Sequence, residues 1–109
     1  MRVVRGEAFD VVVDLRKRSA TFAKWVGVSL SEQDKTMLWI PEGFAHGFLV
    51  TSECADFLYK ATDYRYPQHE RSLLWNDPRV GIDWPLAGPP SLAAKDAAGA
   101  LLANADVYP

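Results

Sequence analysis

The sequence has little cysteine, no long hydrophobic run and no excess of charge of one sign. Cys54 is the only cysteine among 109 residues, which excludes an internal disulfide and a zinc site built from several cysteines. No apolar run approaches the roughly 18 residues of a membrane span, and the N-terminus lacks the apolar core of a signal peptide. With 12 basic and 14 acidic residues, the basic footprint of a nucleic-acid binder is missing too. We therefore expect a cytoplasmic protein that binds neither nucleic acid nor a membrane.

Common catalytic motifs are also absent. The sequence contains no Gly-x-Gly-x-x-Gly, no Walker-type loop, no His-Glu-x-x-His and no Gly-x-Ser-x-Gly. Its two histidines, His46 and His69, stand far apart. No spacing singles out the carboxylates that would complete a metal site with them. We expect no bound metal.

The composition is that of an ordinary folded domain. Hydrophobic residues make up 49% and charged residues 24% of the chain, which argues against disorder. Four Trp, four Tyr and five Phe are many for this length, and such rings usually fill a β core or line a pocket. The length corresponds to one domain.

Alternating polarity dominates the first half of the chain. In residues 9–15 the side chains at positions 9, 11, 13 and 15 are apolar, whereas Asp10 and Asp14 fall on the other face. This period of two predicts a strand that is buried on one face only. Segments 22–30 and 55–62 alternate in the same way. Residues 2–6 also read as extended.

Three shorter apolar segments complete a predicted all-β fold. Residues 37–40 form a continuous apolar run, which indicates a buried strand, and residues 47–50 and 72–75 read as short strands. Six short segments at near-regular spacing point to a sandwich or barrel. The Ala-rich stretch 92–104, interrupted by Gly99, is a candidate helical segment.

Three features carry possible chemistry, and from the residues alone each has two interpretations. His46 stands between two aromatic rings in a glycine-containing loop, either bonded to nearby backbone or donating to a ligand oxygen. Tyr59 is either a core tyrosine with its hydroxyl at the rim or a proton donor in a pocket. Lys95 and Asp96 are adjacent opposite charges, which usually mark a solvated face. Glu70 likewise reads as loop surface.

Taken together, the sequence resembles the dTDP-4-dehydrorhamnose 3,5-epimerase family. The resemblance covers nearly the whole chain, in order and with family-like spacing. The segments that carry it are residues 5–16, 19–22, 25–28, 38–48, 57–62, 75–78, 81–85 and 94–96.

The resemblance implies an incomplete cupin-type jelly roll over residues 1–109 with a short C-terminal helical segment. It further implies a homodimer that works without metal or organic cofactor on dTDP-4-dehydro-6-deoxyglucose. In that reaction a base removes the acidic protons at C3 and C5, next to the C4 ketone, and a donor returns them from the other face. A cation stabilises the enolate oxygen. The motifs do not separate this activity from epimerisation at C3 or C5 alone.

The family's functional residues map onto five positions. Tyr59 matches its proton-donating tyrosine, in a Leu-Tyr-Lys setting. Asp96 matches the aspartate that orients the family's catalytic histidine. His46 matches a histidine that contacts substrate, and Glu70 and Lys95 match positions that bind the nucleotide-sugar.

Two family residues have no counterpart in this sequence. The general-base histidine and the enolate-binding lysine would both lie before Met1, and Arg65 stands where the family commonly has a tyrosine. The main hypothesis is thus the C-terminal part of an epimerase, with little or no activity on its own. The alternative is a non-catalytic cupin remnant that binds a nucleotide-sugar or a partner chain. A generic β-sandwich interaction module fits the composition but leaves the ordered motifs unexplained.

Overall fold

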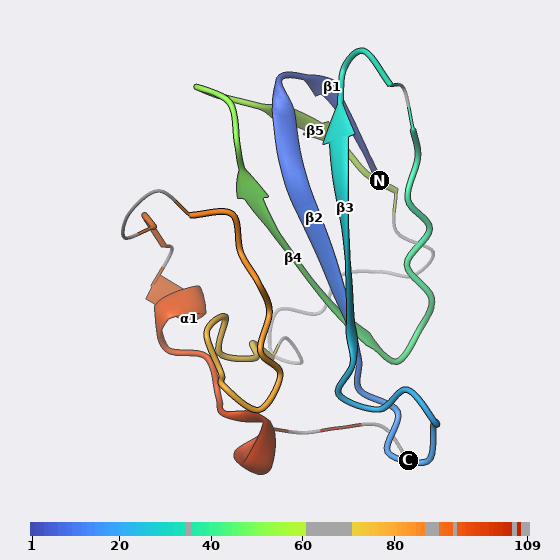
Figure 1. Ribbon diagram of the computed structural model, residues 1–109, viewed down its shortest axis with the longest axis vertical. Helices are drawn as coiled ribbons and strands as arrows, with labels where there is room; N and C mark the ends of the chain where they lie inside the picture. Colours follow the sequence, from blue (N-terminus) through green and yellow to red (C-terminus); the bar gives the residue numbers. More distant parts are fainter. Residues whose placement is uncertain (35, 61–70, 87–89, 93, 106, 108–109) are drawn as a thin grey trace.

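A computed structural model describes residues 1–34, 36–60, 71–86, 90–92, 94–105 and 107. Figure 1 shows its elements along the chain. They are β1 (Arg2–Arg5), β2 (Glu7–Asp14), β3 (Trp25–Ser31), β4 (Phe44–Val50), β5 (Asp56–Leu58), α1 (Ala94–Ala97) and the 3-10 helix η2 (Leu102–Asn104).

The strands form two antiparallel sheets. One has three strands in the order β3-β2-β4, and the other pairs β1 with β5. Such sheets confirm the predicted all-β class and the strands expected near residues 9–15, 22–30 and 47–50. Of the strand expected over 55–62, residues 56–58 form a strand, and residues 55, 59 and 60 do not. Its last two positions lie outside the described residues.

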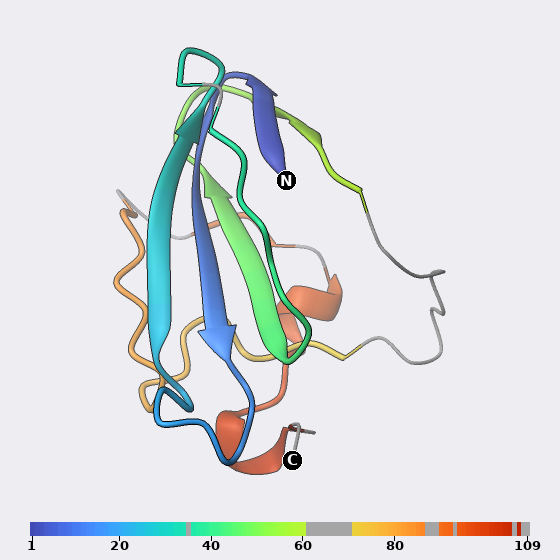
Figure 2. The ribbon, with the colours of Figure 1, turned by 90° about the vertical axis from the view of Figure 1, so that its right-hand side faces the viewer.

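The three-stranded sheet is covered on both faces. On one face Val11 and Val13 pack with Val80 and Leu102 from the C-terminal half. On the other, Ala8 and Leu30 pack with Val3 of β1. Figures 1 and 2 show these two coverings on opposite sides of the sheet, β1 on one and the segment that precedes α1 on the other.

This double covering corrects one prediction. Asp10 and Asp14 were expected on an open face, but their exposed fractions are 0% and 1%. Because β2 is the central strand of a sheet covered on both sides, alternation separates its two faces without leaving either in solvent. Each carboxylate is therefore held by a partner within the chain.

The partners of Asp14 lie in the turn that follows β2. Its carboxylate accepts hydrogen bonds from the Arg16 guanidinium at 3.0 Å and from the Thr21 hydroxyl at 2.5 Å. The guanidinium also lies 4.9 Å from the centre of the Phe44 ring, in a cation–π contact. The Arg16 bond holds the pKa of Asp14 well below its ordinary value. The turn after β2 is thereby joined to the first residue of β4.

Two predicted strands are wrong in the structure. Residues 37–40 form no strand, and Met37 and Trp39 are 71% and 72% exposed. Leu38 exchanges two backbone hydrogen bonds with Met1, of 2.7 and 2.8 Å, and packs against the cluster that contains Val3 of β1. Residues 72–75 contribute a single parallel bridge, Leu73 to Ala100. A short apolar run does not itself supply the neighbour that a strand needs.

The C-terminal segment is helical on either side of Gly99, as predicted. Four residues form α1 and three form η2. A side chain at Gly99 would lie 2.7 Å from the backbone of Leu73, so this position lets two backbones approach closely.

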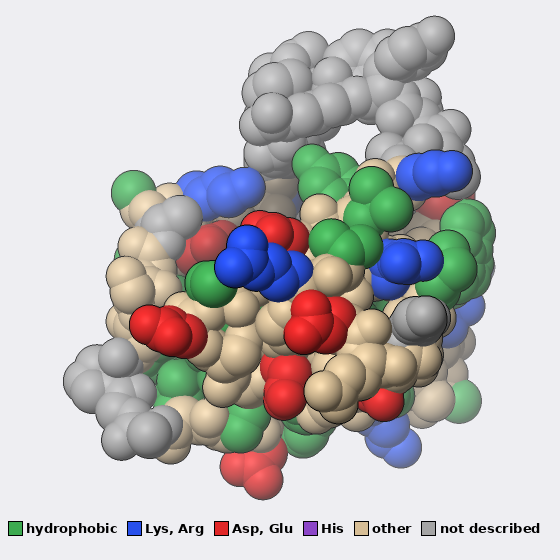
Figure 3. Space-filling model, turned by 90° about the horizontal axis from the view of Figure 1, so that it is seen from above, with side chains coloured by type: hydrophobic (Ala, Val, Ile, Leu, Met, Phe, Trp, Pro, Cys, Tyr) green, Lys and Arg blue, Asp and Glu red, His purple; other side chains and the backbone are tan. Residues whose placement is uncertain are grey.

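Charge is mixed on the end of the molecule that Figure 3 shows, where acidic and basic side chains alternate. No helix of the described residues is long and apolar enough to cross a membrane.

Candidate functional site

His46 is held by a carboxylate on the neighbouring strand. It lies on β4 directly opposite Val12 of β2, and its Nε2–H donates to Oδ1 of Asp10. The His46 side chain is 21% exposed and that of Asp10 is fully buried. Since an ionised carboxylate only accepts hydrogen bonds, this contact fixes Nε2 as the donor and leaves Nδ1 as the second ring nitrogen.

Aromatic rings continue from His46 to β5. The His46 and Phe48 ring centres are 6.2 Å apart, and those of Phe48 and Phe57 are 4.2 Å apart. Tyr59 follows two positions after Phe57, just beyond the end of β5, and is 69% exposed. Its phenol is thus available to a ligand on the side of the molecule that β5 forms.

A cavity of about 760 Å³ lies between β4, residues 73–75 and α1. His46, Lys95 and Asp96 all line it, together with Trp75 and Trp84. The indole N–H of Trp84 donates to the Trp75 carbonyl at 2.9 Å, which joins two sides of this wall. The structure thus brings three of the five predicted site residues to one cavity.

The other two predicted residues are Tyr59 and Glu70. Tyr59 does not line the cavity. Glu70 lies outside the described residues. Among the residues that are described, no group of three or more His, Cys, Asp or Glu side chains is placed to hold a metal ion.

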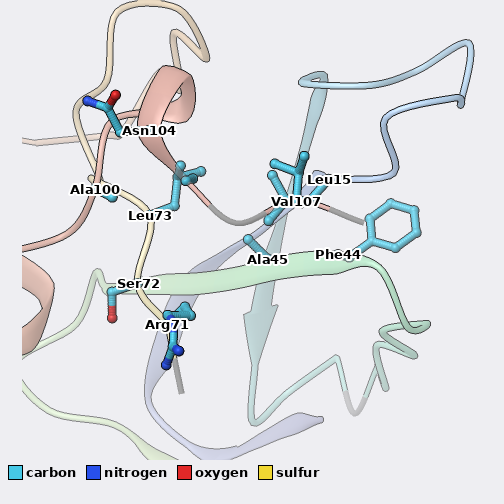
Figure 4. A pocket seen from close by; sticks show the side chains of 10 residues that line it. Leu15, Phe44, Ala45, Arg71, Ser72, Leu73, Ala100, Asn104 and Val107 are labelled. Carbon is cyan, nitrogen blue, oxygen red and sulfur yellow. The ribbon is translucent and has the colours of Figure 1, made fainter. Parts of the chain in front are cut away.

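A second cavity, of about 400 Å³, lies on the side of the sheet that the C-terminal segment covers. Figure 4 shows Leu15 and Val107 across from Leu73, with Arg71 and Asn104 at different places on its wall. None of the four predicted site residues that the structure describes lines it.

Sequence reasoning missed two buried carboxylates near the site. Asp10 was placed on an exposed face, and Asp77 had no role beyond its place in the segment 75–78 that carries the family resemblance. Asp77 is 3% exposed and accepts hydrogen bonds from the backbone N–H groups of Leu102 at 2.6 Å and Arg79 at 2.9 Å. These bonds, that of Leu102 first, hold the pKa of Asp77 below its ordinary value. For Asp10, the signal in the sequence was an aspartate within a strand that is otherwise rich in valine.

Acid is expected to destabilise the chain through Asp14 and Asp77. Both carboxyls have a pKa below 3.8 in the folded chain, so the unfolded chain takes up protons first as the pH falls. Their contribution to the free energy of unfolding is complete above about pH 5 and declines as the pH falls below about 4. Urea unfolding followed by tryptophan fluorescence across this range measures the decline.

Matched variants separate this effect from general acid sensitivity. Asp77→Asn removes one of the two groups and is expected to flatten the decline. Asp83→Asn changes an exposed carboxyl and should leave the slope unchanged. Equal slopes for all three proteins would contradict the assignment.

The arrangement suits proton transfer and the binding of an anionic ligand. A histidine fixed by a buried carboxylate has one defined donor nitrogen. An ammonium and a second carboxylate line the adjoining cavity. Such groups can hold a phosphate-bearing molecule and move protons at a carbon next to a carbonyl.

Comparison with known proteins agrees with this chemistry. The family model described as dTDP-4-dehydrorhamnose 3,5-epimerase matches residues 1–104. A protein of that name from Pseudomonas aeruginosa is 55% identical over all of this chain and 60% of its own length. One from Salmonella typhimurium is 59% identical over 96% of this chain and 57% of its own.

Solved structures give the same result. The dTDP-6-deoxy-D-glucose-3,5-epimerase of Legionella pneumophila, crystallised with dTDP-4-keto-L-rhamnose, superposes with a TM-score of 0.93 at 53% identity. That match covers 96% of this chain and 56% of the Legionella chain. The fold is therefore that of the cupin-type epimerases, and this chain spans less than two thirds of the length of the relatives it matches. The chain belongs to the dTDP-4-dehydrorhamnose 3,5-epimerase family.

Proposed function

We propose that this chain forms part of the active site of a dTDP-4-dehydrorhamnose 3,5-epimerase. The substrate is dTDP-4-dehydro-6-deoxyglucose, whose C3 and C5 protons are lost and returned on the opposite face. The observation that carries the proposal is the bond between His46 on β4 and the buried Asp10 carboxylate on β2, beside a cavity that His46, Lys95 and Asp96 line.

Each residue has a role that its place allows. The Nε2 of His46 is bonded to Asp10, so its Nδ1 and the neighbouring Phe48 ring are the groups that contact the substrate. Lys95 supplies a positive charge for the diphosphate. Tyr59 is the proton donor, and its exposure beyond β5 suits a group that meets a ligand. Asp96 orients a histidine that this sequence does not hold.

A general base is the part that the described site does not supply. Asp10 already engages His46, and His69 lies outside the described residues. General acid–base assistance is typically worth about 10² to 10⁴ in rate. The 109-residue chain alone is therefore expected to bind the nucleotide portion of the substrate and to leave its carbon-bound protons in place.

Solvent deuterium incorporation into dTDP-4-dehydro-6-deoxyglucose tests the chemistry, with mass spectrometry as the readout. We expect no incorporation above that of a Tyr59→Phe variant. Incorporation above that control would show that a base is present. It would contradict the proposal that this chain lacks the general base.

Calorimetric titration with dTDP tests the binding. Lys95→Ala is expected to weaken the affinity about tenfold, because one charge-assisted contact is lost. Lys24→Ala changes an exposed lysine beside β3 and serves as the control. Absence of dTDP binding by the unchanged chain would contradict the proposal.

The alternative is a non-catalytic module that binds a nucleotide-sugar or a partner chain. Strands β3 and β4 both have one edge unpaired among the described residues, and such edges accept a further strand. Under this alternative dTDP binds, and adding the segment that precedes this region in the relatives restores no exchange. Three further predictions are one incomplete jelly-roll domain over residues 1–109, a homodimer and a cytoplasmic location. Size-exclusion chromatography with light scattering tests the homodimer.

A further inference from the structure

The turn that carries Lys95 and Asp96 is not held by its own packing. Helix α1 has four residues, and none of them is buried. At its end the Ala98 N–H donates to the Ala94 carbonyl at 3.1 Å, and the Gly99 N–H donates to the Asp96 carbonyl at 3.3 Å. A helix this short is marginal in water, so its place beside β4 depends on the chain around it, including the chain that follows.

That chain is anchored immediately after α1. The N–H of Ala100 donates to the Ser72 carbonyl at 2.9 Å, and the Ala100 carbonyl accepts from the Leu74 N–H at 2.8 Å. Gly99 lets these backbones meet, because a side chain there would lie 2.7 Å from Leu73. This backbone pairing fixes the C-terminal end of α1 against residues 72–74.

Asp77 provides the polar part of the anchor. Its Oδ2 accepts from the Leu102 N–H at 2.6 Å across 25 positions of sequence, and its Oδ1 accepts from the Arg79 N–H at 2.9 Å. Leu102 itself is 6% exposed, in one core cluster with Val11 and Val80. The carboxylate thus joins the turn at 76–81 to the end of the segment that bears Lys95 and Asp96.

We propose that Asp77 is a positioning residue that holds Lys95 and Asp96 at the 760 Å³ cavity through its bond to the Leu102 backbone. The part of this proposal that concerns ligand binding rests on the proposed function, in which Lys95 contacts the diphosphate. The other part of the proposal, that Asp77 fixes the position of residues 94–105, does not depend on any ligand.

Asp77→Asn tests the hold directly. Asn has one acceptor oxygen where Asp has two, so its NH₂ group faces one of the two backbone N–H groups and one bond is lost. Hydrogen exchange of the peptide over 94–105 is expected to become about ten- to a hundredfold faster. Exchange at Val11 and Val13 of β2 should not change. Asp83→Asn is the control.

A second pair of variants removes the donor instead of the acceptor. Leu102 begins η2, and Leu101 before it has φ -62 and ψ 150, a conformation that suits the residue before proline. Leu102→Pro therefore deletes the N–H at a position where proline fits a helix start. Leu102→Ala keeps the N–H and loses the side chain. Faster exchange over 94–105 in Leu102→Pro than in Leu102→Ala is expected.

Binding separates positioning from mere stability. If Asp77 acts through Lys95, Asp77→Asn weakens dTDP affinity in the unchanged chain but adds nothing in a Lys95→Ala background. Additive losses would overturn the positioning role. Unchanged exchange over 94–105 in both Asp77→Asn and Leu102→Pro would overturn the anchor. If dTDP does not bind at all, the proposed function fails, and the exchange result still decides whether Asp77 holds the segment.

Discussion

His46→Ala is expected to lower the free energy of unfolding by about 3 kcal/mol, which is large for a chain of this size. The Asp10 carboxylate has an exposed fraction of 0%, and its Oδ1 is bonded to His46. Its Oδ2 has no hydrogen-bond partner among the residues that the structure describes. Removing the imidazole leaves a buried carboxylate without its one described partner, and an uncompensated buried charge is costly.

A double-mutant cycle identifies the cause of this loss. Asp10→Asn removes the charge, so in the His46→Ala background it is expected to recover most of the lost stability. His46→Gln keeps an N–H donor of similar reach and is expected to lose less than His46→Ala. Urea unfolding followed by tryptophan fluorescence measures the four proteins of the cycle and His46→Gln.

The outcome that would contradict this account is additivity. If Asp10→Asn destabilises the chain equally with and without His46, the two side chains are not coupled. The loss in His46→Ala would then come from packing against Phe48, whose ring centre lies 6.2 Å away.

The sequence predicts local features of this fold well. Alternation at positions 9–15 identifies β2 and separates its two faces correctly, and Gly99 marks the break between α1 and η2. These features depend on residues a few positions apart, which is the range over which periodicity and glycine act. The comparisons confirm the family. The resemblance predicts site roles for His46, Lys95 and Asp96, and the structure brings these three residues to one cavity.

The failures concern contacts between distant segments. The burial of Asp10 depends on whether a second layer covers its face, and no pattern within β2 encodes that. Trp39 reads as buried in a continuous apolar run, yet it has 72% of its surface exposed. The bond from Asp77 to Leu102 spans 25 residues, so neither end indicates the other.

Buried carboxylates connect these failures with the site. Asp10 and Asp77 are each buried, each bonded, and each next to an element that lines the cavity. Isolated buried charge is unfavourable, so a folded chain retains it only where partners are fixed. The same fixed partners define where His46 and α1 lie.

Gly6→Ala is the second large effect, with an expected loss of roughly 2 to 4 kcal/mol. Gly6 joins β1 to β2 with φ +82, a conformation that non-glycine residues rarely adopt. A side chain there would collide with the Cys54 carbonyl oxygen and lie 2.7 Å from the Ser52 hydroxyl. That hydroxyl accepts from the Glu7 N–H at 2.9 Å, so the collision strikes the start of β2 as well.

Gly81→Ala is the matched control, because it shares the conformation without the collision. Gly81 has φ +67, and the nearest atom to an added side chain is the Pro78 carbonyl oxygen at 3.6 Å. Backbone strain alone then predicts a loss of about 1 kcal/mol. Urea midpoints compare the two variants directly. The account is contradicted if the stability loss in Gly6→Ala is no larger than that in Gly81→Ala. Residues 52–54 would then move aside freely, and this contact would not fix β1 and β5 against the three-stranded sheet.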